Sequence, residues 1–358
     1  METWILDTNF NSVSVLDTFE SLIWTDRYRE YGDFEIFAFP TSQLLNDAKD
    51  DYYLYNPASE HTMIIEHHEV TTDIEEGPRF IVTGRSLESI LMRRVVWKQT
   101  TISGSLQNGI KKLITENFIA PEVLERKMTN FVFVDSSDPE ITKLTHEQQY
   151  TGDIVYDIIA DLCNTYDIGF KITLNIDKKR FEFSLYKGKD RSYAQEINPY
   201  VVFSPNYENI INSNYTHSIK DYKNVTRIGG EGVGVDRKMT TYGEASGLIR
   251  REIFTDARDV SSKTDNGETI SDEVYLDLLK QRGKENLAEY PIKEGFDGEV
   301  EASKMFIYGR DFFLGDCVQV QNEFGMSGTS LVSEIVFSQD ENGESTYPTF
   351  LSLQKAGD

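Results

Sequence analysis

The sequence predicts an α+β protein that is rich in β-strands, and three observations support this prediction. Residues 1–83 contain short strand-like segments, which are separated from one another by residues typical of turns. The apolar residues of 86–166 recur at helical spacing instead, and strand-like segments return after Asn198-Pro199. Runs of short strands with such punctuation are typical of barrels or sandwiches. The chain thus has a strand region, then a mixed region, then a second strand region. This order allows two similar antiparallel β-barrels with a small α+β insert between them.

Residues 1–95 are predicted to form the first β-barrel domain. Its strand-like segments are Trp4–Leu6, Val13–Leu16, Leu22–Trp24, Phe34–Phe39, Tyr52–Tyr55, Met63–Val70 and Phe80–Thr83. Breaks fall at Gly32, Pro40, Pro57 and Pro78, where the backbone geometry of glycine and proline interrupts strand pairing. Aromatic residues are abundant, with 21 Phe and 19 Tyr in the chain, and this excess favours strands.

Residues 96–195 are predicted to form the α+β insert. Ser86, just before it, and Ser105 can each cap a helix, because apolar residues follow both at helical spacing. A third helix is predicted over about 151–166. A β-hairpin follows, since apolar and polar residues alternate on both sides of the polar turn 177–180.

Residues 229–358 are predicted to form the second β-barrel domain, with one helix near 270–289. The run Gly229–Gly234 at its start contains a G-x-G-x-G pattern, which also occurs in dinucleotide-binding loops. Such a loop needs a helix to begin at once, so that the helix N-terminus faces the pyrophosphate. Residues 236–243 show no helical face. The glycine run therefore predicts a hinge or a bulged hairpin.

The bulk composition excludes several classes of protein. The 358 residues carry 60 acidic and 36 basic side chains, a net charge of −24, and so acidic a surface repels nucleic-acid phosphates. No apolar run reaches the ~18–20 residues that a membrane helix needs, so no membrane span is expected. The only two cysteines, Cys163 and Cys317, are far apart and are predicted to be reduced structural thiols.

The best candidate for a metal site is His61 with His67-His68-Glu69. In a strand, His61, His67 and Glu69 point to one face and imitate a two-histidine, one-carboxylate iron site. His68 points to the other face, so the adjacent histidines cannot chelate together. We expect a structural strand without a metal or other cofactor, and we expect alanine at His61, His67 or Glu69 to change stability by no more than about 0.5 kcal/mol.

Two further patterns imitate binding sites. Asp153, Asp157 and Asp161 lie four residues apart and could pass for a carboxylate cluster, but they are predicted to face solvent opposite the apolar side of their helix. Tyr52–Tyr55 could form an aromatic platform for a sugar or a partner. Tyrosines in strands more often pair across strands with half-buried rings, and both interpretations are kept open.

Several phrases, in order along nearly the whole chain, resemble the tail-hub proteins of siphophages, the tail-associated Tal-like family of baseplate hub and distal tail proteins. They are Asp26-Arg27-Tyr28 with Tyr31–Glu35, Thr83–Leu91, Asp190-Arg191-Ser192 with Asn198-Pro199, Val202-Phe203-Ser204, Tyr222–Val225 and Tyr308–Asp316. Each phrase is short, and the ordered series carries the resemblance.

The resemblance implies a non-enzymatic, structural tail hub. Such hubs are homotrimers at the distal end of the tail tube, and each subunit has two tube-like β-barrels, so the trimer presents six barrels to a six-fold tube. By analogy, residues 196–228 return to the first barrel. The expected partners are other copies of the chain, the distal tail ring protein and tail tube above, and tail spike, fibre or receptor-binding proteins below. Assembly in the host cytoplasm and a final place in the virion, at the tail tip, are implied.

Two other functions stay open, and the hub itself predicts a feature of its channel. The chain ends at Asp358, without a wall-cleaving or fibre domain, which argues against direct host recognition or wall digestion. A module that binds host-surface, cell-wall glycan is the first alternative, and a metal-dependent enzyme is the second. A hub lines the channel through which DNA leaves without tight binding. Candidates for an acidic lining are Glu66, Glu69, Asp73, Glu75 and Glu76, and a merely solvated outer face is the alternative.

Overall fold

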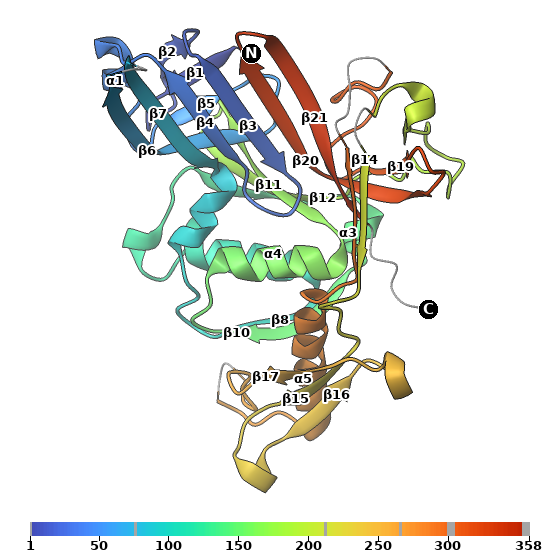
Figure 1. The fold of residues 1–358 in the computed structure, drawn as a ribbon. Coiled ribbons are helices and arrows are strands. Elements are labelled where there is room, and N and C mark those ends of the chain that lie inside the picture. The colour runs from blue at the N-terminus through green and yellow to red at the C-terminus, as the bar shows by residue number, and fades with distance from the viewer. Residues whose placement is uncertain (1, 75–76, 211–212, 265–266, 299–304, 353–358) are drawn as a thin grey trace.

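The computed structural model describes residues 2–74, 77–210, 213–264, 267–298 and 305–352. Figure 1 shows three layers along the long axis: a large sheet, a mixed helical region beneath it that contains α4 (Val155–Tyr166), and a small unit around α5 (Asp272–Ala288) at the far end. The β-rich α+β class predicted from the sequence is therefore confirmed. Among the described residues no ladder joins the two end strands of the large sheet, so the sheet is open there.

The N-terminal part of the large sheet is an antiparallel array in the spatial order β3-β4-β7-β6-β5-β1-β2. Its strands and one short helix are β1 (Thr3–Leu6), β2 (Ser12–Leu16), β3 (Ser21–Arg27), β4 (Asp33–Ala38), α1 (Ser42–Asp47), β5 (Tyr53–Tyr55), β6 (Thr62–Asp73) and β7 (Gly77–Ser86). Alternate side chains of β4 (Phe34, Ile36 and Ala38) are buried, as the period of a strand requires. The seven segments expected from the sequence coincide with these strands, except that Phe39 lies just after β4 and Tyr52 just before β5.

C-terminal strands complete the same sheet. The long strand β20 (Ser327–Asp340) pairs antiparallel with β3, which lies some 300 residues earlier in the chain, and Phe337 is opposite Trp24. An ion pair stabilises the pairing of β3 with β20, because the Nε atom of Arg27 lies 2.7 Å from the Glu334 carboxylate of β20. The other strands on this side are β13 (Val202–Phe203), β14 (Ser213–Ser218), β18 (Lys293–Gly298), β19 (Cys317–Gln321) and β21 (Gly343–Ser352), with the 3-10 turn η4 (Pro205–Tyr207) after β13.

The pairing of β13 and β14 bears on the segment 196–228, which was expected to return to the first barrel. β13 runs parallel to β19, and β14 runs antiparallel to β18. The segment thus pairs directly with C-terminal strands. Because β20 joins those strands to β3, β13 and β14 belong to the same continuous sheet as the N-terminal strands, whereas the segment's last residues, from Val225, belong to a separate three-stranded sheet.

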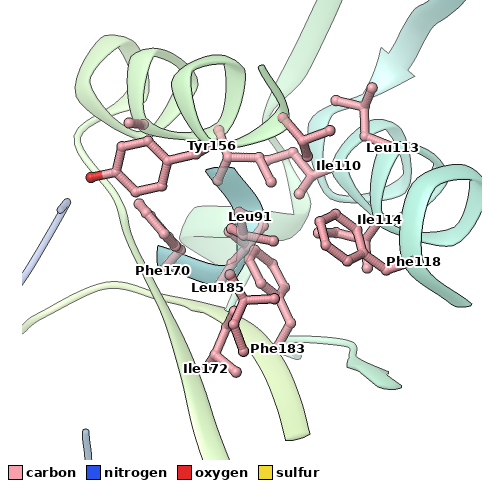
Figure 2. Close-up of a cluster of buried hydrophobic side chains, with 14 of the residues drawn as sticks. Leu91, Ile110, Leu113, Ile114, Phe118, Tyr156, Phe170, Ile172, Phe183 and Leu185 are labelled. Atoms are coloured by element: carbon pink, nitrogen blue, oxygen red, sulfur yellow. The ribbon is translucent and has the colours of Figure 1, made fainter. Parts of the chain in front are cut away.

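The mixed region contains the predicted helices and hairpin. Its elements are η1 (Leu87–Arg93), β8 (Thr100–Ser105), α2 (Leu106–Ile114), η2 (Thr115–Ile119), η3 (Leu124–Arg126), β9 (Phe131–Val134), α3 (Pro139–Thr142), β10 (Thr145–Tyr150), α4, β11 (Gly169–Asn175) and β12 (Arg180–Tyr186). Figure 2 shows side chains from η1, α2, α4 and the β11–β12 hairpin pointing toward one another, with Leu91, Ile110, Phe118 and Phe183 all buried. A dry core of this kind fixes the region against the sheet.

Two helix predictions need correction. The segment after Ser86 is a 3-10 helix, and Ser86 does not cap it, since its hydroxyl accepts a hydrogen bond from the Gly32 N–H at 2.7 Å instead. The third helix begins at Val155, later than the expected residue 151. Ser105 does cap α2, as predicted, by accepting a hydrogen bond from the Asn108 N–H.

The small unit consists of β15 (Val225–Gly229), η5 (Gly234–Asp236), β16 (Met239–Tyr242), η6 (Gly247–Ile249), β17 (Glu252–Asp256) and α5. The glycine run connects β15 to the antiparallel strand β16, as a hairpin connection does. α5 covers this sheet, and its Tyr275 and Leu279 pack with Ile228 in a separate core. No helix in the described part of the chain is long and apolar enough to cross a membrane.

Candidate functional site

The structure separates the residues of the predicted metal site. His61 is buried, whereas His67, His68 and Glu69 are exposed on β6. A β-bulge between Ile65 and His67 shifts the alternation of side chains, so the expectation that His61 shares a face with His67 and Glu69 is wrong. Within the described ranges, no three His, Cys, Asp or Glu side chains come together as a metal site requires.

Replacing His67 or Glu69 with alanine should leave the fold nearly intact. Both side chains are exposed, and such substitutions change the free energy of unfolding by no more than about 0.5 kcal/mol. Urea denaturation of the two variants, with elemental analysis of the purified wild-type chain, checks this expectation. If the wild-type chain contains stoichiometric metal and either variant has lost it, the interpretation of β6 as a purely structural strand is contradicted.

His61 belongs instead to a buried cluster of charged groups. Its Nδ1 atom lies 3.1 Å from Oε1 of Glu88, which also accepts a hydrogen bond from the Ile172 N–H at 2.7 Å. Asp26 lies in the same cluster and accepts hydrogen bonds from Trp24 Nε1 at 2.8 Å and from the Ser59 hydroxyl at 2.7 Å. The side chain of His61 is only 2% exposed and that of Glu88 is fully buried.

The pKa shifts in this cluster follow from burial and charge. Burial alone would lower the pKa of His61, but the charges of Glu88 and Asp26 outweigh it and raise the pKa to about 9. Burial opposes ionisation of Glu88 as well, yet the charge of His61 and the hydrogen bonds to this carboxylate keep its pKa below the usual value. Burial raises the pKa of Asp26. His61 is therefore a buried cation paired with Glu88.

The cluster can stabilise but cannot catalyse, because a substrate has no access to side chains this deeply buried. It joins β3, the loop before β6, η1 and β11, and so ties the large sheet to the mixed region. The sequence could not reveal it, since Glu88 is 27 residues from His61 and 84 from Ile172. An acidic residue in the first turn of a predicted helix was the only local signal.

A second polar cluster joins the mixed region to the small unit. The imidazole of His146 on β10 lies 2.8 Å from the Tyr150 hydroxyl and 3.1 Å from that of Tyr166. Glu285 of α5 approaches the same site, 3.3 Å from the Tyr150 hydroxyl. Burial, with Lys284 and Arg282 nearby, lowers the pKa of His146 to about 3, and burial raises that of Glu285 to about 7. His146 is thus a neutral hydrogen-bonding group at this joint.

The predicted aromatic platform Tyr52–Tyr55 is not an open surface. The Tyr53 ring packs 5.5 Å from Phe10 and 5.7 Å from Phe181, measured between ring centroids. Tyr55 packs partly against the same core. The interpretation of half-buried strand tyrosines is the one that fits, because these rings fill the joint between the sheet and the mixed region.

Three of the five acidic candidates for a channel lining are on the described strand β6. Glu66 is half-buried and pairs with Arg85 at 2.6 Å, whereas Glu69 and Asp73 are exposed on β6. Glu75 and Glu76 lie outside the described residues. Of the helical acids, Asp157 and Asp161 are exposed on α4, as expected, and Asp153 accepts a hydrogen bond from the Thr151 N–H just before the helix.

Comparisons with known proteins show the family and the fold of this chain. The sequence profile of a family described as "Siphovirus ReqiPepy6 Gp37-like protein" matches residues 2–350. Among solved structures, a 43 kDa tail protein of prophage MuSo2 from Shewanella oneidensis superposes with a TM-score of 0.59 at 10% identity, over 98% of both chains. A tail protein from Neisseria meningitidis gives 0.57 at 12% identity, over 98% of this chain and 96% of its own.

The prophage tail protein gp18 from Listeria monocytogenes also gives a TM-score of 0.57, at 13% identity, over 99% of this chain and 96% of its own. Identities this low show a common fold and no more. No curated protein sequence matches the chain. The likeness extends over nearly the full length of each tail protein, so the large sheet, the mixed region and the small unit are all included.

Proposed function

Because this chain belongs to the Siphovirus ReqiPepy6 Gp37-like family, we propose that it is a structural protein of the tail of a long-tailed bacteriophage. The observation that carries the proposal is the extent of the match, from residue 2 to residue 350, together with a fold that phage tail proteins share over 98–99% of this chain. The buried charge clusters support it, since they join the parts of a scaffold and expose no reactive group. The protein carries out no chemistry in this proposal.

The specific role is that of a tail hub: a homotrimeric ring at the distal end of the tail tube. Two tube-like β units per chain give a three-fold ring a six-fold face, which suits a six-fold tube. Strands from both ends of the sequence build the large sheet, and within the described residues its end strands β2 and β14 do not pair with each other. Unpaired edges of this kind are covered in stable proteins, and neighbouring copies can cover them.

The partners follow from that position. The ring contacts the distal tail ring protein and the tail tube above it, and spike, fibre or receptor-binding proteins below it. The virion tail tip is its final place, after assembly in the host cytoplasm. DNA passes through the ring without tight binding, because a chain of net charge −24 repels phosphates.

The exposed carboxylates Glu69 and Asp73 are the described residues that best fit an acidic channel wall. Duplex DNA carries one charge about every 1.7 Å of its axis, and basic walls would hold it through counterion release. Acidic side chains in the wall do not bind the DNA in this way. A neutral or basic wall in a map of the assembled ring would contradict the acidic channel that we propose.

The purified chain should form a homotrimer in solution. Light scattering should give the mass of three 41.1-kDa chains. The interfaces in the trimer should each be larger than the ~1,600 Å² typical of transient complexes. A stable dimer or tetramer would contradict the ring. A hub that trimerises only on the tail would give a monomer in solution, and the trimer must then be sought in assembled tails.

A further inference from the structure

Residues 191–201 form a compact loop whose two ends meet. The Val201 N–H donates to the Arg191 carbonyl at 3.0 Å, and both ends attach to β19, since Arg191 N–H donates to Cys317 O and Gln319 N–H donates to Val201 O. Loops of 6–16 residues with closed ends are Ω-loops, which often carry function. The phrases Asp190-Arg191-Ser192 and Asn198-Pro199, which the hub role has not yet explained, build this loop.

Hydrogen bonds inside the loop hold it in one conformation. The Gln195 side chain accepts from the N–H groups of Ile197 and Asn198, at 2.7 and 2.6 Å, and donates to the carbonyls of Ser192 and Asn198, both at 3.1 Å. Asn198 in turn donates to the Asp190 carbonyl at 2.9 Å. The loop is therefore ordered before any partner binds.

A buried ion pair fixes the base of the loop. The Nε atom of Arg191 lies 2.6 Å from Oδ2 of Asp316, and both side chains are almost completely buried. Asp316 also accepts hydrogen bonds from the Lys189 N–H at 2.7 Å and the Phe313 N–H at 3.0 Å. The Arg191 end of the loop is thus bound to one buried carboxylate, which directly precedes β19.

This rigid loop displays apolar and aromatic side chains to water. Ile197 is 91% exposed, and Tyr193 and Tyr200 of the same loop are exposed with ring centroids 5.3 Å apart, edge to face. The exposed Tyr207, just after the loop, lies near Tyr193. An isolated exposed aliphatic residue is ordinary, but an aliphatic residue among three tyrosines on an ordered loop has the composition of an interface centre.

The charged side chains along this surface are mostly acidic. In residues 189–208, all of which the structure describes, the exposed charged side chains are Asp190, Glu196, Glu208 and one cation, Lys189, while Arg191 is buried. A partner that covers the loop must place basic groups near these carboxylates. Tyrosine faces also attract lysine and arginine.

We propose that the loop 191–201 is a docking site for another tail protein, one that offers an apolar recess for Ile197 with a rim of Lys or Arg side chains. This inference rests on the proposed role in the tail and names the surface and the chemistry of one partner. Because the loop is ordered in advance, binding loses little conformational entropy. A second copy of this chain that met it loop to loop would bring its own carboxylates against these. A sugar would need an open ring face, whereas here an isoleucine protrudes and two tyrosines meet edge to face.

The test measures binding of each tail-tip protein of the same virion, purified separately, to the immobilised full chain. Ile197→Asp should weaken one of these complexes at least ~30-fold, the effect of a single interface centre. Leu248→Asp is the matched control, because Leu248 is 99% exposed in the small unit, and it should change the affinity less than about threefold. Glu196→Lys should slow association and reduce its dependence on salt.

The other outcomes overturn the inference in distinguishable ways. If the Ile197→Asp and Leu248→Asp variants bind a tail protein with equal affinity, the proposed role in the tail is still supported, but the loop 191–201 is not the docking site for that protein. A change in the chain's own mass on Ile197→Asp would make a second copy the occupant. Binding of a soluble peptidoglycan fragment that Tyr200→Ala abolishes would make the occupant a glycan. A wild-type chain that binds none of the tail proteins would remove the proposed function as well.

Discussion

The His61→Ala variant should unfold about 3–5 kcal/mol more easily than the wild type, the usual cost of removing one partner from a buried ion pair. The substitution leaves the carboxylates of Glu88 and Asp26 buried without their cation. This corrects the expectation from the sequence that alanine at His61 would be harmless, which rested on a surface strand. Urea denaturation followed by the fluorescence of the buried Trp24, which donates to Asp26, measures the difference.

The pH dependence of stability provides a second readout of the same pair. The pKa of His61 is about 9 in the folded protein and about 6.5 when unfolded, so its contribution is complete below about pH 6.5 and is lost as the pH rises through 9. His61→Gln should lack this loss. His67→Ala is the matched control and should keep the wild-type profile. Equal stability of His61→Ala and His67→Ala would contradict the buried pair.

Replacing Asp316 with alanine should have an effect of similar size. The change leaves the Arg191 guanidinium buried without a counter-charge, and it removes the acceptor of the Lys189 and Phe313 N–H groups. We expect a loss of about 3–5 kcal/mol in the free energy of unfolding, together with weaker binding through the loop 191–201. Urea denaturation measures the first effect.

Asp221→Ala is the control for this substitution. Asp221 also forms an ion pair, 2.9 Å from Lys293, but both side chains are exposed, and such pairs contribute less than about 1 kcal/mol. Asp316→Ala and Asp221→Ala should therefore differ by several kcal/mol. If the two variants unfold at the same urea concentration, the Arg191–Asp316 pair does not fix the base of the loop.

The sequence predicted the elements whose signal is local. The hairpin β11–β12 has Ile172 opposite Phe183 and Leu174 opposite Phe181, which is the alternation of apolar residues expected on either side of the turn 177–180. The helices α2 and α5 were also predicted, α2 from the Ser105 cap and apolar residues at helical spacing, and α5 from its apolar residues, with the expected bounds of about 270–289 close to the observed Asp272–Ala288.

The parts that the sequence could not predict depend on long-range contacts. The pairing of β3 with β20 joins residues some 300 apart, and no local pattern encodes such a register. The bulge after Ile65 turned His61 inward and His67 outward, so an argument from strand parity failed there. The Tyr53 ring packs against Phe10 and Phe181, which lie far from Tyr53 in the sequence.

The docking loop was visible in the sequence only as two unexplained phrases. Asp190-Arg191-Ser192 and Asn198-Pro199 contain the residues that close the loop and hold it to the sheet. The exposed side chains between them, Tyr193 and Ile197, have no periodic pattern, and their exposure became evident only in three dimensions.

A cryo-electron microscopy map of the intact virion tests the central claim most directly. The account predicts that the chain forms a three-fold ring at the distal end of the tail tube, with acidic side chains such as Glu69 and Asp73 toward the channel. It also predicts density of a neighbouring tail protein over the loop 191–201. A map without this chain, or with it at a place other than the tail tip, would contradict the proposed function.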